Sequence, residues 1–294
     1  MESLLTIVIP SYNEEQSLKH LLPTVLAFSK KHNFSLVVVN DGSTDASKLV
    51  LDAFLLDYPI FRVIHHKVNR GYGGAIKSGI EACASKYVIT IDADGQHNLE
   101  DIEKMVSVLK STDADMVVGN RAGGYNHRFR ETGKWIIRKT AKFLMPLHIK
   151  DLNSGMKLYS VPMAKKYLHL CPNSMAYSDI ITLIFISQKH LVVETPITIN
   201  QRMAGKSTIG IKTAFDTIME ILNIVMLFNP MRIFLTLSVL IALLSLAWEI
   251  PIFLRGNGLS VGALLGFTVS IFLFLLGLIA EQLGLLRRLV INKD

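Results

Sequence analysis

Two aspartates one residue apart are the side chains in this chain best suited to chemistry. Asp92 and Asp94 follow an apolar, β-branched run at residues 87–91, which predicts a buried strand. Residues i and i+2 of an extended chain point the same way, so the two carboxylates repel each other unless a cation joins them. Such hard oxygen ligands suit Mg²⁺ or Mn²⁺ that also binds a diphosphate. The plainer alternative is a polar turn at Gly95 that caps the next helix.

Three more polar segments come directly after predicted strands. Strands are expected at residues 4–9, 36–39, 62–65, 87–91 and 116–119, and the additional polar segments occupy residues 10–15, 40–45 and 69–75. Strands that alternate with helices predict an α/β protein with a doubly wound, mainly parallel sheet. Ligands of such sheets collect at the carboxyl ends of the strands, where all these polar segments fall.

The same polar segments offer starts for helices. We expect Ser11 or Asn13 to cap one helix and Ser43 or Thr44 to open a second that runs to about residue 56. Glycines 71, 73 and 74 lack the G-x-G-x-x-G spacing, so they favour a nucleotide pocket over a site for a hydride-transfer cofactor. Further helices are expected at 76–84 and near 99–110, and a strand at 197–200.

The apolar residues of the chain concentrate near its end. Half of the 294 residues are hydrophobic, and mean hydropathy is +0.37. Residues 233–254 and 259–286 carry one charge each, Glu249 and Glu281. At 1.5 Å per residue the first run extends about 33 Å, enough for a hydrocarbon core of about 30 Å. We therefore expect two transmembrane helices; two buried core helices are the alternative.

Basic residues set the expected orientation and domains. Arg232 precedes the first run and Arg287, Arg288 and Lys293 follow the second, whereas Arg255 is the one cation between them. This bias predicts a cytoplasmic N-terminal domain at a bacterial-type plasma membrane, and the net charge of +7 fits an anionic surface or substrate. The expected domains are a catalytic domain at 1–212, an amphipathic interface helix at 213–229 and a transmembrane hairpin with a short cytoplasmic tail at 230–294.

A basic stripe lies between residues 128 and 147. Arg130, Lys134, Arg138 and Lys142 recur every four residues, which places them on one face of a helix. Such a helix lies on an anionic membrane or binds a phosphate; a solvated charged face is the alternative. Residues 201–207 add two cations on a flexible loop, which is otherwise an ordinary turn.

Taken together, the ordered motifs resemble those of the GT-A-fold family 2 glycosyltransferases. The segments that carry the resemblance are Pro10-Ser11-Tyr12-Asn13-Glu14, Asn40-Asp41-Gly42-Ser43-Thr44-Asp45, Asn69-Arg70-Gly71-Tyr72-Gly73-Gly74-Ala75 and Asp92-Ala93-Asp94-Gly95-Gln96-His97. Residues 151–159 and the C-terminal helix pair resemble the polyprenyl-phosphate hexosyltransferase branch. Asn40 departs from the pattern, because many members have a second Asp there, and we expect it to adjust nucleotide contacts.

The resemblance implies a role for each matching residue. The metal, Mg²⁺ or Mn²⁺, would be held by Asp92, Asp94 and Gln96. Arg130, Lys134, Arg138 and Ser154 would bind the acceptor phosphate, and Asp92, Asp94, Arg121 and Asp151 would be catalytic, with Asp151 near the anomeric carbon. The nucleotide sugar would be bound by Pro10, Tyr12, Asn13, Glu14, Asp41, Gly71, Lys77, Asp92, Ala93, Arg202 and Lys206.

The implied activity is inverting transfer of a hexose from a UDP- or GDP-sugar to undecaprenyl or dolichyl phosphate. The product would serve cell-envelope glycan, glycolipid or protein glycosylation. A phosphomonoester is already ionised near neutral pH, so this nucleophile needs no strong general base. The bilayer is a further partner, nucleic acid is not, and a homo-oligomer such as a tetramer is expected.

Four other functions compete with this interpretation. A processive polysaccharide synthase would carry a Gln-x-x-Arg-Trp signature, which the sequence lacks. A transferase with a hydroxyl acceptor and an inactive adaptor that binds nucleotide sugars both stay open. A two-helix transporter would need more polar groups than Glu249 and Glu281 to line a path.

Overall fold

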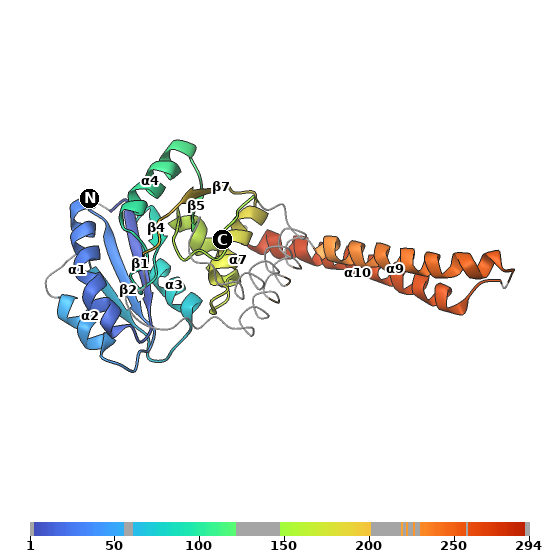
Figure 1. Cartoon of the computed structure of the whole chain (residues 1–294), viewed down its shortest axis with the longest axis horizontal. Helices are drawn as coiled ribbons and strands as arrows, with labels where there is room; N and C mark the ends of the chain where they lie inside the picture. The colour runs from blue at the N-terminus through green and yellow to red at the C-terminus, as the bar shows by residue number, and fades with distance from the viewer. Residues whose placement is uncertain are drawn as a thin grey trace. The chain divides into compact units, whose positions relative to one another are not determined.

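A computed structural model describes residues 3–55, 61–121, 148–200, 219, 222, 226, 230–256 and 258–291 (Figure 1). The chain divides into two compact units, residues 1–139 with 147–220 and residues 140–146 with 221–294. The predicted domain boundaries at residues 212 and 229 lie outside the described residues.

The first unit alternates strands and helices along the sequence. Its strands are β1 Leu5–Ser11, β2 Ser35–Asn40, β3 Phe61–His65, β4 Tyr87–Thr90, β5 Met116–Asn120, β6 Lys157–Ser160 and β7 Val192–Pro196. Its described helices are α1 Glu15–His32, α2 Ser47–Leu55, α3 Tyr72–Glu81, α4 Glu100–Thr112, α6 Val161–Tyr167, the 3₁₀ turn η1 Leu168–Leu170 and α7 Tyr177–Ser187.

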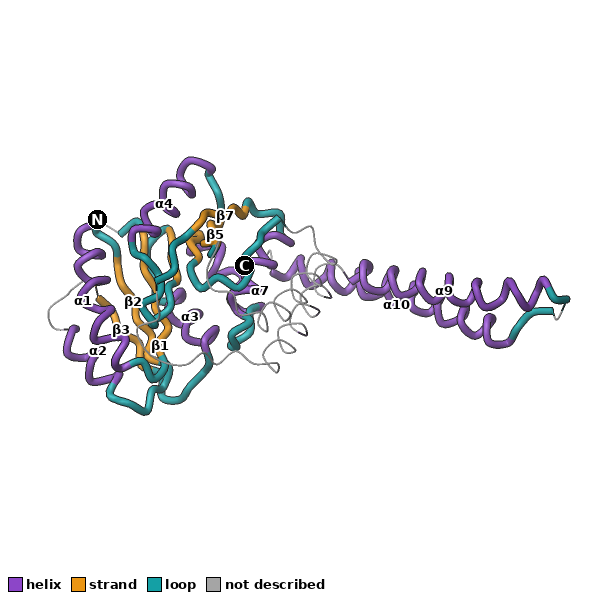
Figure 2. Tube along the Cα trace, viewed as in Figure 1, coloured by secondary structure: helices purple, strands orange, loops and turns teal. Residues whose placement is uncertain are grey.

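These strands form one seven-stranded sheet in the order β3-β2-β1-β4-β6-β5-β7. Among the described strands only β6 runs antiparallel, paired with β4 on one side and β5 on the other, while the remaining described pairs are parallel. Figure 2 shows the strands in orange and the helices in purple. The predicted doubly wound, mainly parallel sheet is confirmed. Because β6 enters from the opposite direction, its first residues lie at the same edge as the carboxyl ends of β4 and β5.

Alternating side chains of β1 show how the sheet is covered on both faces. Leu5, Ile7 and Ile9 are buried in a core that includes the apolar side of α1. Val8 points to the other face, where Gly79 of α3 packs on the strand so closely that a Cβ there would lie 3.4 Å from a Val8 methyl and 3.3 Å from a Val39 methyl. A bulkier residue at 79 would push α3 off the sheet.

Several predicted helix starts are wrong, for one reason. The N-cap of α1 is Glu14, with no side-chain cap, so neither Ser11 nor Asn13 caps it. Asn13 adopts φ 54° and its Oδ1 accepts a hydrogen bond from the backbone N–H of Thr44 at 2.8 Å. Three of the side chains predicted to cap helices, those of Asn13, Ser43 and Thr44, thus link neighbouring loops instead.

Other boundaries differ as well. Helix α2 begins at Ser47 rather than at residue 43 or 44, because the Ser47 N–H donates to Asp45. Helix α3 begins at Tyr72, four residues earlier than predicted, and includes two of the glycines. The strand predicted at 197–200 is wrong: β7 ends at Pro196, and Ile199 makes an isolated bridge to His97.

The second unit contains the helices α9 Pro230–Leu254 and α10 Val261–Ile291. The hydroxyls of Ser238 and Ser270 each donate to the other residue's carbonyl at 2.9 Å, and Ser245 packs against Gly266. Glu249 is buried and accepts from the N–H of Ser260, the residue before α10. The outward surfaces are apolar, and both helices are long and apolar enough to cross a membrane, as predicted.

Candidate active site

The loops after β1 and β2 are fastened to each other. The N–H of Asn13 donates to the Ser43 hydroxyl at 2.9 Å, and the N–H of Glu15 donates to Asp45 at 3.1 Å. Pro10 lies at the buried end of β1, whereas the Tyr12 side chain is exposed beside these contacts. The two loops therefore form one pre-shaped edge of the sheet.

Asp41 organises the loop that precedes α3. Its buried carboxylate accepts from the N–H groups of Arg70 and Gly71 at 2.9 and 2.8 Å, and lies 2.6 Å from Nδ1 of His66. Gly71 has φ 89°, a conformation that favours glycine. Asp41 thus fixes the protein's own backbone, whatever it adds to nucleotide binding.

The glycines at the start of α3 also serve internal packing. The N–H groups of Gly73 and Gly74 donate to the Asn173 carbonyl at 2.9 and 3.3 Å. Lys77, one turn further on, donates to the Cys171 carbonyl at 2.5 Å. The free donors of this helix N-terminus therefore hold residues 171–173. Asn40 also makes contacts within the protein: its amide nitrogen lies 3.1 Å from Nδ1 of His65, and its amide oxygen accepts from the N–H of Ser43.

Asp92 lies just beyond the carboxyl end of β4 and is held from two sides. Oδ1 accepts from the Tyr72 hydroxyl at 3.0 Å, and Oδ2 lies 3.3 Å from Nε2 of His97. The backbone of Gly155 packs directly on the carboxylate, where a Cβ would come within 2.8 Å of Cγ. Even so, the Asp92 side chain stays 35% exposed.

This environment keeps Asp92 ionised. Burial opposes the charge, but the contacts with His97 and Tyr72 and the positive charge of Arg121 outweigh it, so the pKa of Asp92 falls below its ordinary value. Burial and the negative charge of Asp92 raise the pKa of Tyr72 well above its ordinary value, so Tyr72 stays protonated and donates. An ionised, partly exposed carboxylate is suited to bind a cation.

The cluster fits a hard divalent cation that shares its coordination with a ligand. Asp94 is buried, with Oδ1 accepting from the Gln96 N–H at 3.1 Å, and Ala93 between the acids is buried. Gln96 uses its amide nitrogen to bind the Asn200 carbonyl at 3.4 Å, so its carbonyl oxygen is a further acceptor. The described residues contain no group of three His, Cys, Asp or Glu suited to a metal, so two carboxylates and an amide would need diphosphate or water oxygens to complete the shell.

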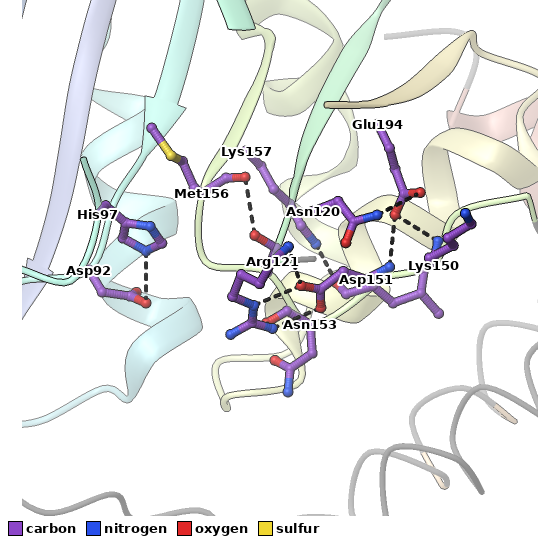
Figure 3. A network of polar contacts seen from close by, with 12 residues as sticks. Asp92, His97, Asn120, Arg121, Lys150, Asp151, Asn153, Met156, Lys157 and Glu194 are labelled. Carbon is purple, nitrogen blue, oxygen red and sulfur yellow. Dashed lines mark hydrogen bonds and ion pairs between the residues drawn. The ribbon is translucent and has the colours of Figure 1, made fainter. Parts of the chain in front are cut away.

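Arg121 and Asp151, both predicted to be catalytic, bind each other. Nε and Nη2 of Arg121 donate to the two carboxylate oxygens at 2.7 and 2.8 Å, and Nη2 also reaches the Asn153 carbonyl at 2.8 Å (Figure 3). Burial works against the guanidinium charge, but Asp151 raises the pKa of Arg121, so the pair is ionic. Two side chains that were predicted separately as catalytic therefore form one ion pair.

Glu194 of β7 holds the segment that carries Asp151. Its Oε1 accepts from the N–H groups of Lys150 and Asp151 at 2.6 and 2.8 Å, and Oε2 lies 3.5 Å from the Asn120 amide (Figure 3). Ser154, predicted to bind the acceptor phosphate, is fully buried, and its hydroxyl reaches the Met156 carbonyl at 3.4 Å. The structure thus places Ser154 inside the turn.

The remaining predicted site residues lie outside the described residues. These are Arg130, Lys134 and Arg138 of the basic stripe, Arg202 and Lys206 of the following loop, and the interface helix at 213–229.

Four residues that contact Asp92 or the segment carrying Asp151 were not predicted as site residues: Tyr72, His97, Lys157 and Glu194. A weak signal existed for two of them, because Lys157 and Glu194 are lone charges inside otherwise apolar strands. Nothing in the spacing of Tyr72 or His97 distinguishes them from the surface residues of a turn.

Comparison with known proteins identifies the family and several relatives. Residues 6–168 match the family described as glycosyl transferase family 2, and residues 229–286 match the GtrB C-terminal hairpin. A dolichyl-phosphate β-glucosyltransferase of Saccharomyces cerevisiae is 29% identical over 71% of this chain and 71% of its own length. An undecaprenyl-phosphate 4-deoxy-4-formamido-L-arabinose transferase of Aeromonas hydrophila is 28% identical over 94% of this chain and 77% of its own.

Solved structures agree on the fold. Glucosyl-3-phosphoglycerate synthase from Mycobacterium tuberculosis, crystallised with Mg²⁺ and UDP, superposes with a TM-score of 0.59 at 17% identity, over 75% of this chain and 79% of that one. The family match covers more than half of the sequence and includes all four polar segments. The chain belongs to glycosyl transferase family 2.

Proposed function

We propose that this protein transfers a hexose, with inversion, from a nucleotide sugar to a polyprenyl phosphate at the cytoplasmic face of a membrane. The observation that carries the proposal is the partly exposed Asp92 at the carboxyl end of β4, held by Tyr72 and His97, in a chain that also contains an apolar helical hairpin. The relatives named as dolichyl- and undecaprenyl-phosphate transferases support the acceptor class.

On the donor side, the edge formed by the β1 and β2 loops would receive the nucleoside, and the acid cluster would face the diphosphate. The rigid contacts between residues 13–15 and 43–45 favour this, because a pre-shaped pocket loses little conformational freedom on binding. Bound Mg²⁺ or Mn²⁺, held by Asp92, Asp94 and Gln96, would neutralise charge on the departing diphosphate.

On the acceptor side, a phosphate oxygen attacks the anomeric carbon while the bond to the nucleoside diphosphate breaks. The nucleophile is ionised before it arrives, so the protein's task is to hold two anions in line and offset their charge. Arg121 directs three N–H contacts to Asp151 and Asn153, and a guanidinium has five such donors. The other two suit an oxygen of the acceptor phosphate, with Asp151 holding the guanidinium in orientation.

The test uses the full chain in lipid nanodiscs. UDP- and GDP-linked hexoses are supplied with Mn²⁺ and either undecaprenyl phosphate or undecaprenol, and products are identified by mass spectrometry. Transfer to the phosphate alone, with a β-linked product from an α-linked donor, is expected. Glycosylation of undecaprenol or of an added glycan would replace this proposal with a hydroxyl-acceptor transferase. Binding of a nucleotide sugar without any transfer or hydrolysis would favour an inactive adaptor.

A further inference from the structure

Lys157 is a buried lysine, 1% exposed, at the start of the antiparallel strand β6. Its ammonium donates to three oxygens: the Leu152 carbonyl at 2.6 Å, the Thr182 hydroxyl at 2.7 Å and the Ser178 carbonyl. An ammonium has three donors, so these contacts saturate it. None of these three partners is a residue assigned above to metal, nucleotide or acceptor.

The three contacts join two separate parts of the fold. Ser178 and Thr182 lie on α7, a helix buried along almost all of its length, whereas Leu152 lies between Asp151 and Asn153, the two residues that hold Arg121. Lys157 therefore connects a rigid helix to the segment that orients the Arg121–Asp151 pair.

The same segment is fastened from the neighbouring strands. The Thr90 hydroxyl of β4 donates to the Gly155 carbonyl at 2.7 Å, and Glu194 of β7 accepts from Lys150 and Asp151. Between these two anchors, Lys157 is the described contact on the carbonyl of Leu152. Gly155 in turn packs on Asp92, so a shift of this segment would disturb both the acid cluster and the Arg121–Asp151 pair.

A buried charge is an expensive way to fill a core position, because an apolar side chain of similar length often serves stability equally well. Burial also lowers the pKa of Lys157 to about 8, although the negative charges of Asp179 and Asp151 act in the opposite direction. Stability alone therefore gives a poor account of a lysine at this position.

We propose that Lys157 is a positioning residue, which holds residues 151–155 against α7 and so keeps Arg121, Asp151 and Asp92 in register for transfer. The inference rests on the proposed function for its kinetic consequence, but its structural part can be measured without any substrate.

The experiment compares wild type with Lys157→Met in nanodiscs by hydrogen–deuterium exchange. Faster exchange in residues 150–156, by about tenfold, is expected, with exchange in β1 and α3 unchanged. The matched control is Lys165→Met, because Lys165 also donates to a backbone carbonyl, that of Cys83 at 2.8 Å, away from the acids. Unchanged exchange at 150–156 in Lys157→Met overturns the proposal.

Kinetics supply the second readout. Lys157→Met should lower kcat about 10- to 100-fold and change the donor KM less than about threefold, whereas Lys165→Met should leave both unchanged. Exchange that rises without a fall in kcat also overturns the proposal. If Lys157→Met does not fold, Thr182→Val removes one of the three acceptors of Lys157, together with the bond of that hydroxyl to the Ser178 carbonyl within α7, and it must raise exchange at 150–156 or the proposal fails.

The two proposals fail in different ways. A wild-type protein that transfers sugar only to undecaprenol overturns the proposed acceptor, while a changed exchange pattern and a lower kcat for that reaction would still support the role of Lys157.

Discussion

The two halves of the sheet use buried charge differently. In the half built from β1, β2 and β3, Asp41 is buried and engaged by Arg70, Gly71 and His66, so its charge shapes a loop. In the half that contains β4, β6, β5 and β7, Asp92 is also held on both oxygens but stays 35% exposed. In the proposed function, the first half would be the rigid receptacle for the nucleoside, and the second would present an ionised group to the diphosphate.

The connections differ too. Contacts in the first half join loops after consecutive strands, such as Asn13 with Ser43. In the second half the antiparallel β6 brings the residues that precede it beside the carboxyl end of β4, so that Gly155 contacts Asp92 and Thr90. We infer that changes in the first half act on donor affinity, and changes in the second act on the rate of transfer.

The largest effect is expected for Asp92→Asn, which removes the charge and keeps the shape. Transfer should fall on the order of 10³-fold, because the leaving diphosphate loses electrostatic stabilisation. Initial rates at saturating donor, with circular dichroism to show that the variant folds, measure this. A variant with near-normal kcat would remove the distinction between the two halves.

Arg121→Lys comes next, because a lysine keeps the charge but cannot form the bidentate contact with Asp151. A fall in kcat of about 10- to 100-fold is expected, with donor KM within about threefold of wild type. Steady-state kinetics with varied donor and lipid separate the two constants. A change confined to donor KM would place Arg121 functionally with the first half.

The matching test of the first half is Asp41→Asn. Its amide cannot accept from Arg70 and Gly71 on both sides, so the loop before α3 should loosen. Donor KM should rise about tenfold with a smaller change in kcat, and the free energy of unfolding should fall by about 1–3 kcal/mol. Isothermal titration with the nucleoside diphosphate tests the affinity directly; an unchanged affinity would contradict the receptacle role.

Tyr72→Phe deletes only the hydroxyl that donates to Asp92. The half-saturating Mn²⁺ concentration should rise about tenfold, because hydrogen bonds to a ligating carboxylate fix its orientation. Activity measured against Mn²⁺ concentration gives this value, with Tyr12→Phe as the control on the exposed side of the first half. Equal shifts in both variants would show that the effect is not specific to Asp92.

The smallest effect concerns pH and stability at Lys157. Its pKa of about 8 in the folded protein, lowered by burial, is below the value of about 10.4 for a free lysine, so the unfolded state binds more protons between these limits. The free energy of unfolding of wild type, relative to Lys157→Met, should therefore rise by about 1 kcal/mol from pH 8 to pH 9. Denaturant titrations of both proteins at both pH values measure this difference in the free energy of unfolding. A difference that does not change between pH 8 and pH 9 would contradict the burial of the charge.

The sequence by itself determined the local features of this protein. Apolar runs of 4–7 residues, each followed by a polar segment, were enough to predict the mainly parallel sheet, because hydrophobic period and turn chemistry act over a few residues. The same holds for the two long apolar helices, whose length and lack of charge need no partner to be recognised. That Asp92 and Asp94 share a metal stays a prediction.

Only the tertiary structure decided how the polar side chains are used. Asn13 was expected to cap a helix and instead binds the next loop, and the glycines of α3 were expected to face a nucleotide but donate their N–H groups to the Asn173 carbonyl. Arg121 and Asp151 became one ion pair, and Tyr72 and Lys157 gained roles that their spacing does not suggest. The physical reason is that a donor or acceptor group can pair with any suitable group that the fold brings within about 3 Å. The order of the strands in the sheet, rather than distance along the sequence, decides which group that is.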